Sequence, residues 1–148
     1  MTKAQKAPVI LLVEDDEDDY LLTLAAFREL GIESHLKRVK NGEELMRFLN
    51  KSNAPAGPET TPKPSLILLD LNMPKMDGHK ALSLIKSDPD LRRIPVTILT
   101  TSQAPADILE TYQLGGNSFI QKAVSYRNFV EQIKIICKYW LDIVKLPN

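Results

Sequence analysis

The chain has 148 residues, 43% hydrophobic and 26% charged, which is the size and composition of one globular domain with a buried core. Its 19 Lys and Arg residues balance 19 Asp and Glu residues, so no net basic charge indicates binding to nucleic acid or to anionic lipid. No apolar run reaches the roughly 18–20 residues that span a bilayer, so no membrane span is predicted. The first residues lack the apolar stretch of a signal peptide and Cys137 is the single cysteine, so we expect a cytoplasmic protein.

The first predicted element is a buried strand that runs directly into six consecutive acidic residues. The apolar run 9–13 has the length of such a strand, and Glu14 to Asp19 follow it. Like charges at this spacing repel one another unless a cation lies among them. A helix is predicted over 18–30 with Gly31 as its stop, so we assign Asp16 to Asp19 to the favourable end of the helix dipole.

The rest of the chain alternates predicted strands and helices in the same way. Short apolar or alternating runs predict strands, and apolar residues at helical spacing predict helices. The further strands are expected at 35–39, 66–69, 96–99 and 119–121, and the further helices begin near Asn41, Gly78, Pro105 and Ser125, the last of which is long and reaches Trp140. Residues 51–64 are rich in proline and are predicted to form an irregular loop.

Five strand–helix pairs predict an α/β fold with a doubly wound parallel sheet. Helices cover both faces of such a sheet, and its functional site lies beyond the carboxyl ends of the strands. We expect a tail at 1–7 and one domain over 8–148. The polar residues that end the predicted strands all fall at the functional edge: Glu14, Asp15, Asp70, Thr100 and Lys122.

The carboxylates at this edge predict a magnesium site beside a nucleophile. Mg²⁺ prefers hard oxygen ligands, and Asp15 and Asp70, with Glu14 acting directly or through water, would supply them. The cation keeps Asp70 ionised, as it must be to attack phosphorus. Lys122 and Thr100 would then offer an ammonium group and a hydroxyl group to the transferred phosphoryl group.

Other site types find little support. The P-loop, dinucleotide-binding, zinc-protease and serine-hydrolase motifs do not occur in the sequence. His35 and His79 lack the spacing of metal ligands, so we assign both to surface or packing positions. Cys137 is predicted to be a packing residue on the last helix.

The motifs resemble those of the receiver domain of two-component response regulators. The resemblance covers residues 8–132 and rests on Val13-Glu14-Asp15, Leu68 to Pro74 with Asp77-Gly78, Leu99-Thr100-Thr101, and Lys122. It implies the flavodoxin-like (βα)5 fold with strand order 2-1-3-4-5. Four further stretches, 51–64, 85–91, 99–102 and 139–147, are similar to the single-domain regulators of cyanobacterial and bacterial phytochromes.

By this resemblance, Asp70 accepts a phosphoryl group from the histidine of a sensor kinase, here a phytochrome. Glu14, Asp15, Asp70 and the backbone carbonyl of Asn72 would bind Mg²⁺, for which Mn²⁺ or Ca²⁺ could substitute. The protein would be a phosphoacceptor that catalyses only its own phosphorylation and dephosphorylation, and not a turnover enzyme. It could also pass the phosphoryl group to a histidine phosphotransfer protein.

The resemblance also implies a switch, and the sequence departs from the family pattern near it. Thr100 would move toward the phosphoryl group. Phe119 takes the aromatic switch position, where tyrosine is common, and it has no hydroxyl group to form a hydrogen bond when the switch moves. The family usually has a proline after the lysine, often with a cis bond, whereas Ala123 follows Lys122 here. A cis bond without proline costs about 3–4 kcal/mol, so this bond is either trans or strained.

The apolar residues near the end of the chain, from Leu141 to Leu146, indicate an interface. We expect a homodimer through the fourth and fifth helices, with the tail contributing. Two alternatives stay open: a Mg²⁺-dependent phosphatase with Asp70 as nucleophile, and a dimeric scaffold that acts without phosphate. Asn72 weakens the first, because it stands where such enzymes often carry a general acid.

Overall fold

Five parallel strands form one sheet in the order β2-β1-β3-β4-β5, as predicted. The structure, a computed structural model, describes residues 8–52 and 61–147, so the predicted tail 1–7 and the middle of the 51–64 loop lie outside the described residues. The strands are β1 (Ile10–Val13), β2 (Leu36–Val39), β3 (Leu66–Leu69), β4 (Val96–Thr100) and β5 (Ser118–Gln121). The helices are α1 (Glu17–Glu29), α2 (Gly42–Ser52), α3 (Gly78–Ser87), α4 (Pro105–Gln113) and α5 (Tyr126–Lys138).

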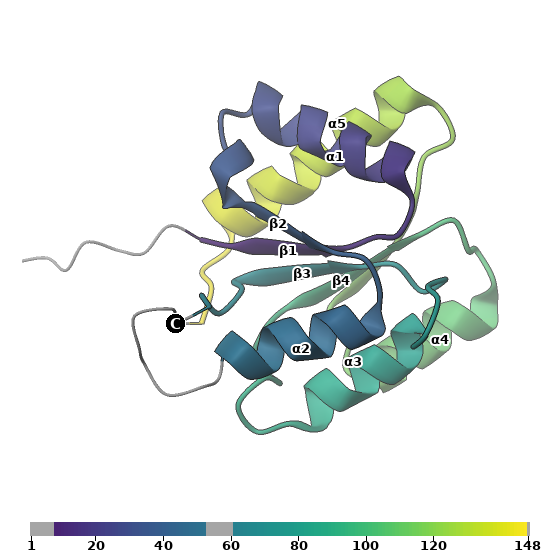
Figure 1. The fold of residues 1–148 in the computed structure, drawn as a ribbon. Coiled ribbons are helices and arrows are strands. Elements are labelled where there is room, and N and C mark those ends of the chain that lie inside the picture. Colours follow the sequence, from purple (N-terminus) through teal and green to yellow (C-terminus); the bar gives the residue numbers. More distant parts are fainter. Residues whose placement is uncertain (1–7, 53–60, 148) are drawn as a thin grey trace, which may run out of the picture.

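The sheet is buried between two helical layers. Figure 1 shows α1 and α5 on one face and α2, α3 and α4 on the other. Side chains of the central strands alternate between these faces: Leu11 and Val13 join the core under α2 and α3, whereas Ile10 and Leu12 join the core under α1 and α5. Strands buried on both faces explain the continuous apolar runs in the sequence.

Local hydrogen bonds fix several helix starts where the sequence predicted them. A carboxylate oxygen of Asp16 accepts from the backbone N–H of Asp19 at 3.0 Å, the amide oxygen of Asn41 accepts from that of Glu44 at 2.9 Å, and Ser125 caps α5 in the same way. These caps satisfy N–H groups that have no partner inside a helix. The strand predicted at 35–39 begins one residue later, at Leu36, because residues 33–35 form a 3₁₀ turn.

The last helix differs from the single long α-helix expected from the sequence. It is α-helical to Lys138 and then widens into a π-helical turn, Tyr139–Ile143, in which the N–H of Val144 donates to the carbonyl of Tyr139 at 2.9 Å. Trp140 is partly buried and packs against the core under α1 and α5. Tyr139 and Ile143 remain exposed.

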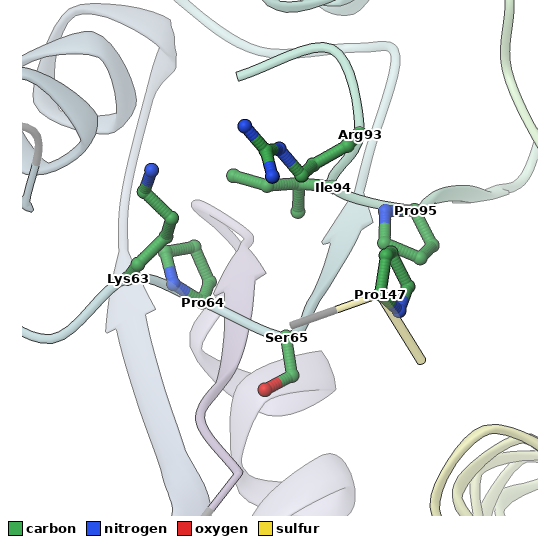
Figure 2. Close-up of a pocket in the computed structure, with 7 residues that line it drawn as sticks. All are labelled: Lys63, Pro64, Ser65, Arg93, Ile94, Pro95 and Pro147. Atoms are coloured by element: carbon green, nitrogen blue, oxygen red, sulfur yellow. The ribbon is translucent and has the colours of Figure 1, made fainter. Parts of the chain in front are cut away.

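The end of the described chain returns to the amino-terminal edge of the sheet. Figure 2 shows Pro147 beside Pro95, and both line a shallow hollow of about 210 Å³ together with Ser65 and Arg93. This edge is opposite the one at which the polar strand ends gather. Among the described residues, no helix is long and apolar enough to cross a membrane.

Candidate functional site

The carboxyl ends of β1, β3 and β5 bring Glu14, Asp70 and Lys122 together. The hydrogen-bond ladder of the sheet continues into these residues, because Asp70 N–H donates to the carbonyl of Val13 at 3.2 Å and Lys122 N–H to that of Thr100 at 2.7 Å. The backbone that carries the three side chains is therefore as rigid as the sheet itself.

Lys122 is surrounded by three carboxylates. Its ammonium nitrogen lies 2.6 Å from Glu14 Oε1, 2.7 Å from Asp19 Oδ2 and 3.2 Å from Asp70 Oδ2. Burial alone would lower the pKa of this ammonium group, but the carboxylates outweigh burial and raise the pKa above its ordinary value. Lys122 is thus charged and held at the acidic cluster.

Glu14 is the most deeply buried of these acids. Burial raises its pKa from 4.5 to about 7, against the opposing effect of Lys122, and the neighbouring charge of Asp70 adds to the increase. Glu14 therefore holds its proton more tightly than an exposed glutamate does, mainly because the charged carboxylate is poorly hydrated at this buried position.

Glu14, Asp15 and Asp70 form the group that fits a divalent cation. Each offers a carboxylate oxygen, and these oxygens all lie within 4.8 Å of one another. Asp15 is exposed while Glu14 and Asp70 are buried, so the group opens to solvent on one side. Hard oxygen donors and partial exposure suit Mg²⁺, which keeps several of its waters. Asn72 is also exposed, and its N–H donates to Asp70 Oδ1 at 3.2 Å.

Asp19 belongs to this site, contrary to the assignment made from sequence. It does lie in the first turn of α1, as predicted, but its carboxylate also bonds Lys122 across the site. The first turn of α1 folds back over the end of β1, so a residue four positions after Asp15 reaches the same edge. Its place in the acidic run 14–19 is the one sequence signal that could have found it, and that signal does not say which acid turns toward Lys122.

Thr100 is the last residue of β4, and Phe119 lies within β5. Thr100 is fully buried, and its hydroxyl oxygen accepts from the N–H of Ser102 at 3.3 Å. Phe119 is half-buried against the core under α2 and α3, and its N–H donates to the hydroxyl oxygen of Tyr112 at 3.2 Å. The structure thus links each predicted switch residue to α4 or to the loop before it.

The Lys122–Ala123 peptide bond is trans. Of the two forms left open by the sequence, the structure adopts the one without the cis cost. The side-chain amide of Gln132 holds the loop, because it accepts from the N–H of Ala123 at 3.0 Å and donates to the carbonyl of Gln121 at 2.8 Å. Gln132 lies one and a half turns into α5, and no local pattern marked it as a loop anchor.

The two histidines differ from each other. His35 is a half-buried packing residue, as predicted, with Nδ1 2.8 Å from the carbonyl oxygen of Pro8. His79 is half-buried as well, and it lies with Asp107 and Glu110 in a second group of potential ligands. Those residues come from two helices, so spacing along the chain could not reveal the group.

Comparison with known proteins identifies the family. The sequence matches the response regulator receiver domain over residues 10–134. The chain belongs to the response regulator receiver family. Response regulator Rcp1 of Synechocystis sp. is 39% identical over 139 residues, covering 94% of this chain and 92% of Rcp1. The probable methanogenesis regulatory protein FilR2 of Methanothrix harundinacea is 34% identical, covering 99% of this chain and 92% of FilR2.

Solved receiver structures share the fold. The Mn²⁺-bound form of Rcp1 superposes with a TM-score of 0.84 at 37% identity, covering 96% of this chain and all of Rcp1 (100%). The phosphorylated cyanobacterial phytochrome response regulator RcpA gives 0.87 at 37% identity, covering 97% of this chain and 100% of RcpA. The five-stranded receiver fold is therefore confirmed, as is the likeness to the phytochrome response regulators.

Receiver domains take up a phosphoryl group on an aspartate in two-component signalling and bind Mg²⁺ at an acidic site. Such a domain is a signalling protein and not an enzyme of the ordinary turnover kind. The oxygen donors found here fit that ion: two buried carboxylates crowd together, and a divalent cation would relieve their repulsion.

Proposed function

We propose that this receiver accepts a phosphoryl group on Asp70 from the phosphohistidine of a sensor kinase. The observation that carries the proposal is the position of Asp70, which follows the central strand β3 and lies beside both the carboxylates of Glu14 and Asp15 and the ammonium group of Lys122. A carboxylate oxygen of Asp70 attacks phosphorus, the P–N bond breaks, and the electron pair of that bond leaves with the imidazole.

The surrounding side chains support this transfer without an added general acid or base. Lys122 stabilises negative charge that gathers on the phosphoryl oxygens, and a bound Mg²⁺ ion would supply further positive charge there. Glu14, Asp15, Asp70 and the carbonyl of Asn72 are the proposed ligands of that ion, for which Mn²⁺ or Ca²⁺ could substitute. We propose that the chain catalyses its own phosphorylation and dephosphorylation through these groups.

Thr100 and Phe119 are the proposed switch. The hydroxyl group of Thr100 would leave the N–H of Ser102 and bond a phosphoryl oxygen, which moves the loop that leads into α4. The backbone of Phe119 is tied to Tyr112 on α4, so a shift of α4 would change the surface formed by α4, β5 and α5.

A hollow beside the site is the proposed docking surface for phosphoryl donors. It has a volume of about 310 Å³, and Lys122 lies at its wall together with apolar side chains of α1 and of the loop before α5. Val124 is 98% exposed there and Tyr126 is 73% exposed. Exposed apolar side chains next to the acceptor favour a helical partner with an apolar face, namely a sensor kinase or a histidine phosphotransfer protein. The likeness to RcpA supports a phytochrome as the kinase.

The α4–β5–α5 surface itself supports a homodimer. Exposed apolar side chains lie along both helices and continue onto the π-helical turn: Leu109, Tyr112, Ile135, Tyr139 and Ile143. We propose that copies of the domain over 8–148 pair through this surface in the cytoplasm. Sedimentation with and without beryllofluoride tests this; a monomer at micromolar concentration in both conditions would contradict it.

Transfer of label from a phosphorylated kinase, or from acetyl phosphate, tests the acceptor assignment. Asp70→Asn should reduce labelling at least about 100-fold, because an amide is not a nucleophile toward phosphorus. Asp77→Asn is the matched control, since Asp77 caps α3 close by and asparagine can replace its hydrogen bond. Retained labelling of Asp70→Asn would contradict the acceptor assignment, whereas rapid release of phosphate from simple esters would favour the phosphatase alternative.

A further inference from the structure

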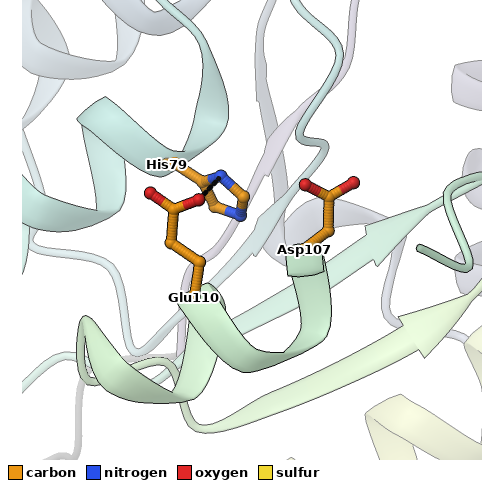
Figure 3. A group of neighbouring side chains, drawn as sticks. All are labelled: His79, Asp107 and Glu110. Carbon is orange, nitrogen blue, oxygen red and sulfur yellow. Dashed lines mark ion pairs between the residues drawn. The ribbon is translucent and has the colours of Figure 1, made fainter. Parts of the chain in front are cut away.

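A second group of metal-ligating side chains bridges α3 and α4, separate from the acidic group at Asp70. His79 lies in the first turn of α3, and Asp107 and Glu110 lie in α4. One nitrogen of His79 and one carboxylate oxygen from each acid lie within 4.8 Å of one another. Figure 3 shows the imidazole ring between the two carboxylate groups.

The surroundings of His79 leave one ring nitrogen for a ligand. Nδ1 lies 3.0 Å from Oε2 of Glu110. Nε2 is buried and has no hydrogen-bond partner among the described residues. In the neutral ring that donates its Nδ1 proton to Glu110, Nε2 carries a free lone pair. A buried lone pair without a partner costs free energy until something binds it.

Asp107 is held in place by a hydrogen bond. It is half-buried, and its Oδ2 accepts from the hydroxyl group of Ser102 at 2.6 Å. Glu110 is 53% exposed, so its long side chain can adjust to a bound ion. The arrangement therefore combines two ordered donors with one adaptable donor.

The donor set selects the class of ion. Mg²⁺ prefers an all-oxygen shell, whereas an imidazole nitrogen with carboxylates suits late divalent transition metals such as Zn²⁺. Tetrahedral Zn²⁺ with bonds of about 2.0–2.2 Å separates its ligand atoms by roughly 3.4 Å. The present separations of up to 4.8 Å would close by a rotation of exposed Glu110.

We propose that His79, Asp107 and Glu110 bind one divalent transition-metal ion of the Zn²⁺ class, with water in the open position. The bound ion would hold the start of α3 against α4. Asp107 is connected through Ser102 to Thr100, since the N–H of Ser102 donates to the Thr100 hydroxyl oxygen. Occupancy of this site and phosphorylation would then influence each other's affinity reciprocally, a consequence that rests on the proposed function.

Co²⁺ titration followed by visible absorption tests the site directly. About 5 mM Mg²⁺ is kept present to occupy the all-oxygen group. We expect one Co²⁺ ion per chain with the absorption of a low-coordinate nitrogen and oxygen site, displaced by Zn²⁺. His79→Gln and Asp107→Asn should each weaken binding by at least about tenfold. His35→Gln, which changes the other histidine, should bind as the unmodified chain does.

Two results would overturn the site: no Co²⁺ spectrum, or equal affinity in His79→Gln and the unmodified chain. Far-UV circular dichroism checks that each variant is folded, and Asp107→Asn keeps the hydrogen bond to Ser102, so loss of fold cannot mimic loss of binding. Asp70→Asn should retain Co²⁺ binding, which separates failure of this site from failure of the phosphoacceptor proposal. Equal Co²⁺ affinity with and without beryllofluoride would overturn the coupling to Thr100.

Discussion

The ammonium nitrogen of Lys122 lies 2.6 Å from Oε1 of Glu14, and the two side chains are only 5% and 3% exposed. An ion pair this deeply buried loses much of its hydration, and the attraction between its charges does little more than offset that loss. Removing one partner costs far more, because the other charge is then buried alone. The burial of this pair is therefore better explained by a role in the chemistry at Asp70 than by a contribution to the stability of the fold.

Lys122→Met should lower the free energy of unfolding by about 3–5 kcal/mol, because Glu14 and Asp70 would then face each other without a cation. Urea denaturation measures this. Lys134→Met is the matched control, since Lys134 pairs with Glu29 and Glu131 on the surface and its loss should leave the free energy of unfolding nearly unchanged. Equal losses in the two variants would show that burial of the Lys122 cluster has no energetic effect.

The raised pKa of Glu14 predicts that Mg²⁺ binds more tightly as pH rises. Glu14 has a pKa of about 7 in the folded protein, and a carboxyl group must lose its proton to bind the ion. Apparent affinity should therefore increase between about pH 6 and 8, by at most about tenfold per unit. Titration calorimetry at constant ionic strength gives the profile. Glu14→Gln should weaken binding and flatten the profile; an equally steep profile in that variant would count against the prediction.

The raised pKa of Glu14 also predicts how the stability of the metal-free protein depends on pH. Because the folded state holds the Glu14 proton more tightly than the unfolded state, this contribution is fully present below pH 4.5 and is lost as pH rises to about 7. The difference in unfolding free energy between the unmodified chain and Glu14→Gln should therefore fall across that window. A difference that rises with pH there would contradict the burial of Glu14.

Thr100→Val should separate phosphorylation from switching. Valine keeps the volume of this fully buried residue but lacks the hydroxyl group, so labelling of Asp70 should persist within about tenfold while the response of α4 is lost. The readout is the amide resonance of Phe119, whose N–H bonds Tyr112 on α4. Beryllofluoride should shift it in the unmodified chain and in Thr100→Ser, and leave it in place in Thr100→Val. A shift of normal size in the valine variant would remove Thr100 from the switch.

Gly78→Ala should destabilise the loop that carries Asp70. A Cβ atom at this position would lie 2.6 Å from the carbonyl oxygen of Asp70 and 2.7 Å from the Cα of Leu71, and backbone atoms cannot yield as a flexible side chain does. We expect a loss of about 1–3 kcal/mol and slower phosphorylation, although alanine favours a helix. Ser83→Ala, at an exposed position of the same helix, should change stability by less than about 0.5 kcal/mol. If Gly78→Ala left the free energy of unfolding unchanged, this would show that the loop relaxes freely around the added Cβ atom.

Much of the fold could be predicted from the sequence because its signals are local. An apolar run predicts a buried strand wherever it lies, and caps such as Asn41 and Ser125 act on residues three positions away. The parallel sheet then places Glu14, Asp70 and Lys122 at one edge, because strands that share a direction also share a carboxyl end. Those residues were therefore accessible to reasoning from strand ends alone.

Only the tertiary structure decided which of these groups touch and what else joins them. Asp19 and Lys122 are 103 residues apart in the chain, and their bond depends on how the first turn of α1 lies over β5. The group at His79 likewise depends on two helices packing side by side, and the hydrogen bond from Ala123 to Gln132 depends on α5 lying beside that loop. Residue patterns record neighbours along the chain, whereas charge, pKa and metal affinity depend on distances in space, which are set when the helices pack on the sheet.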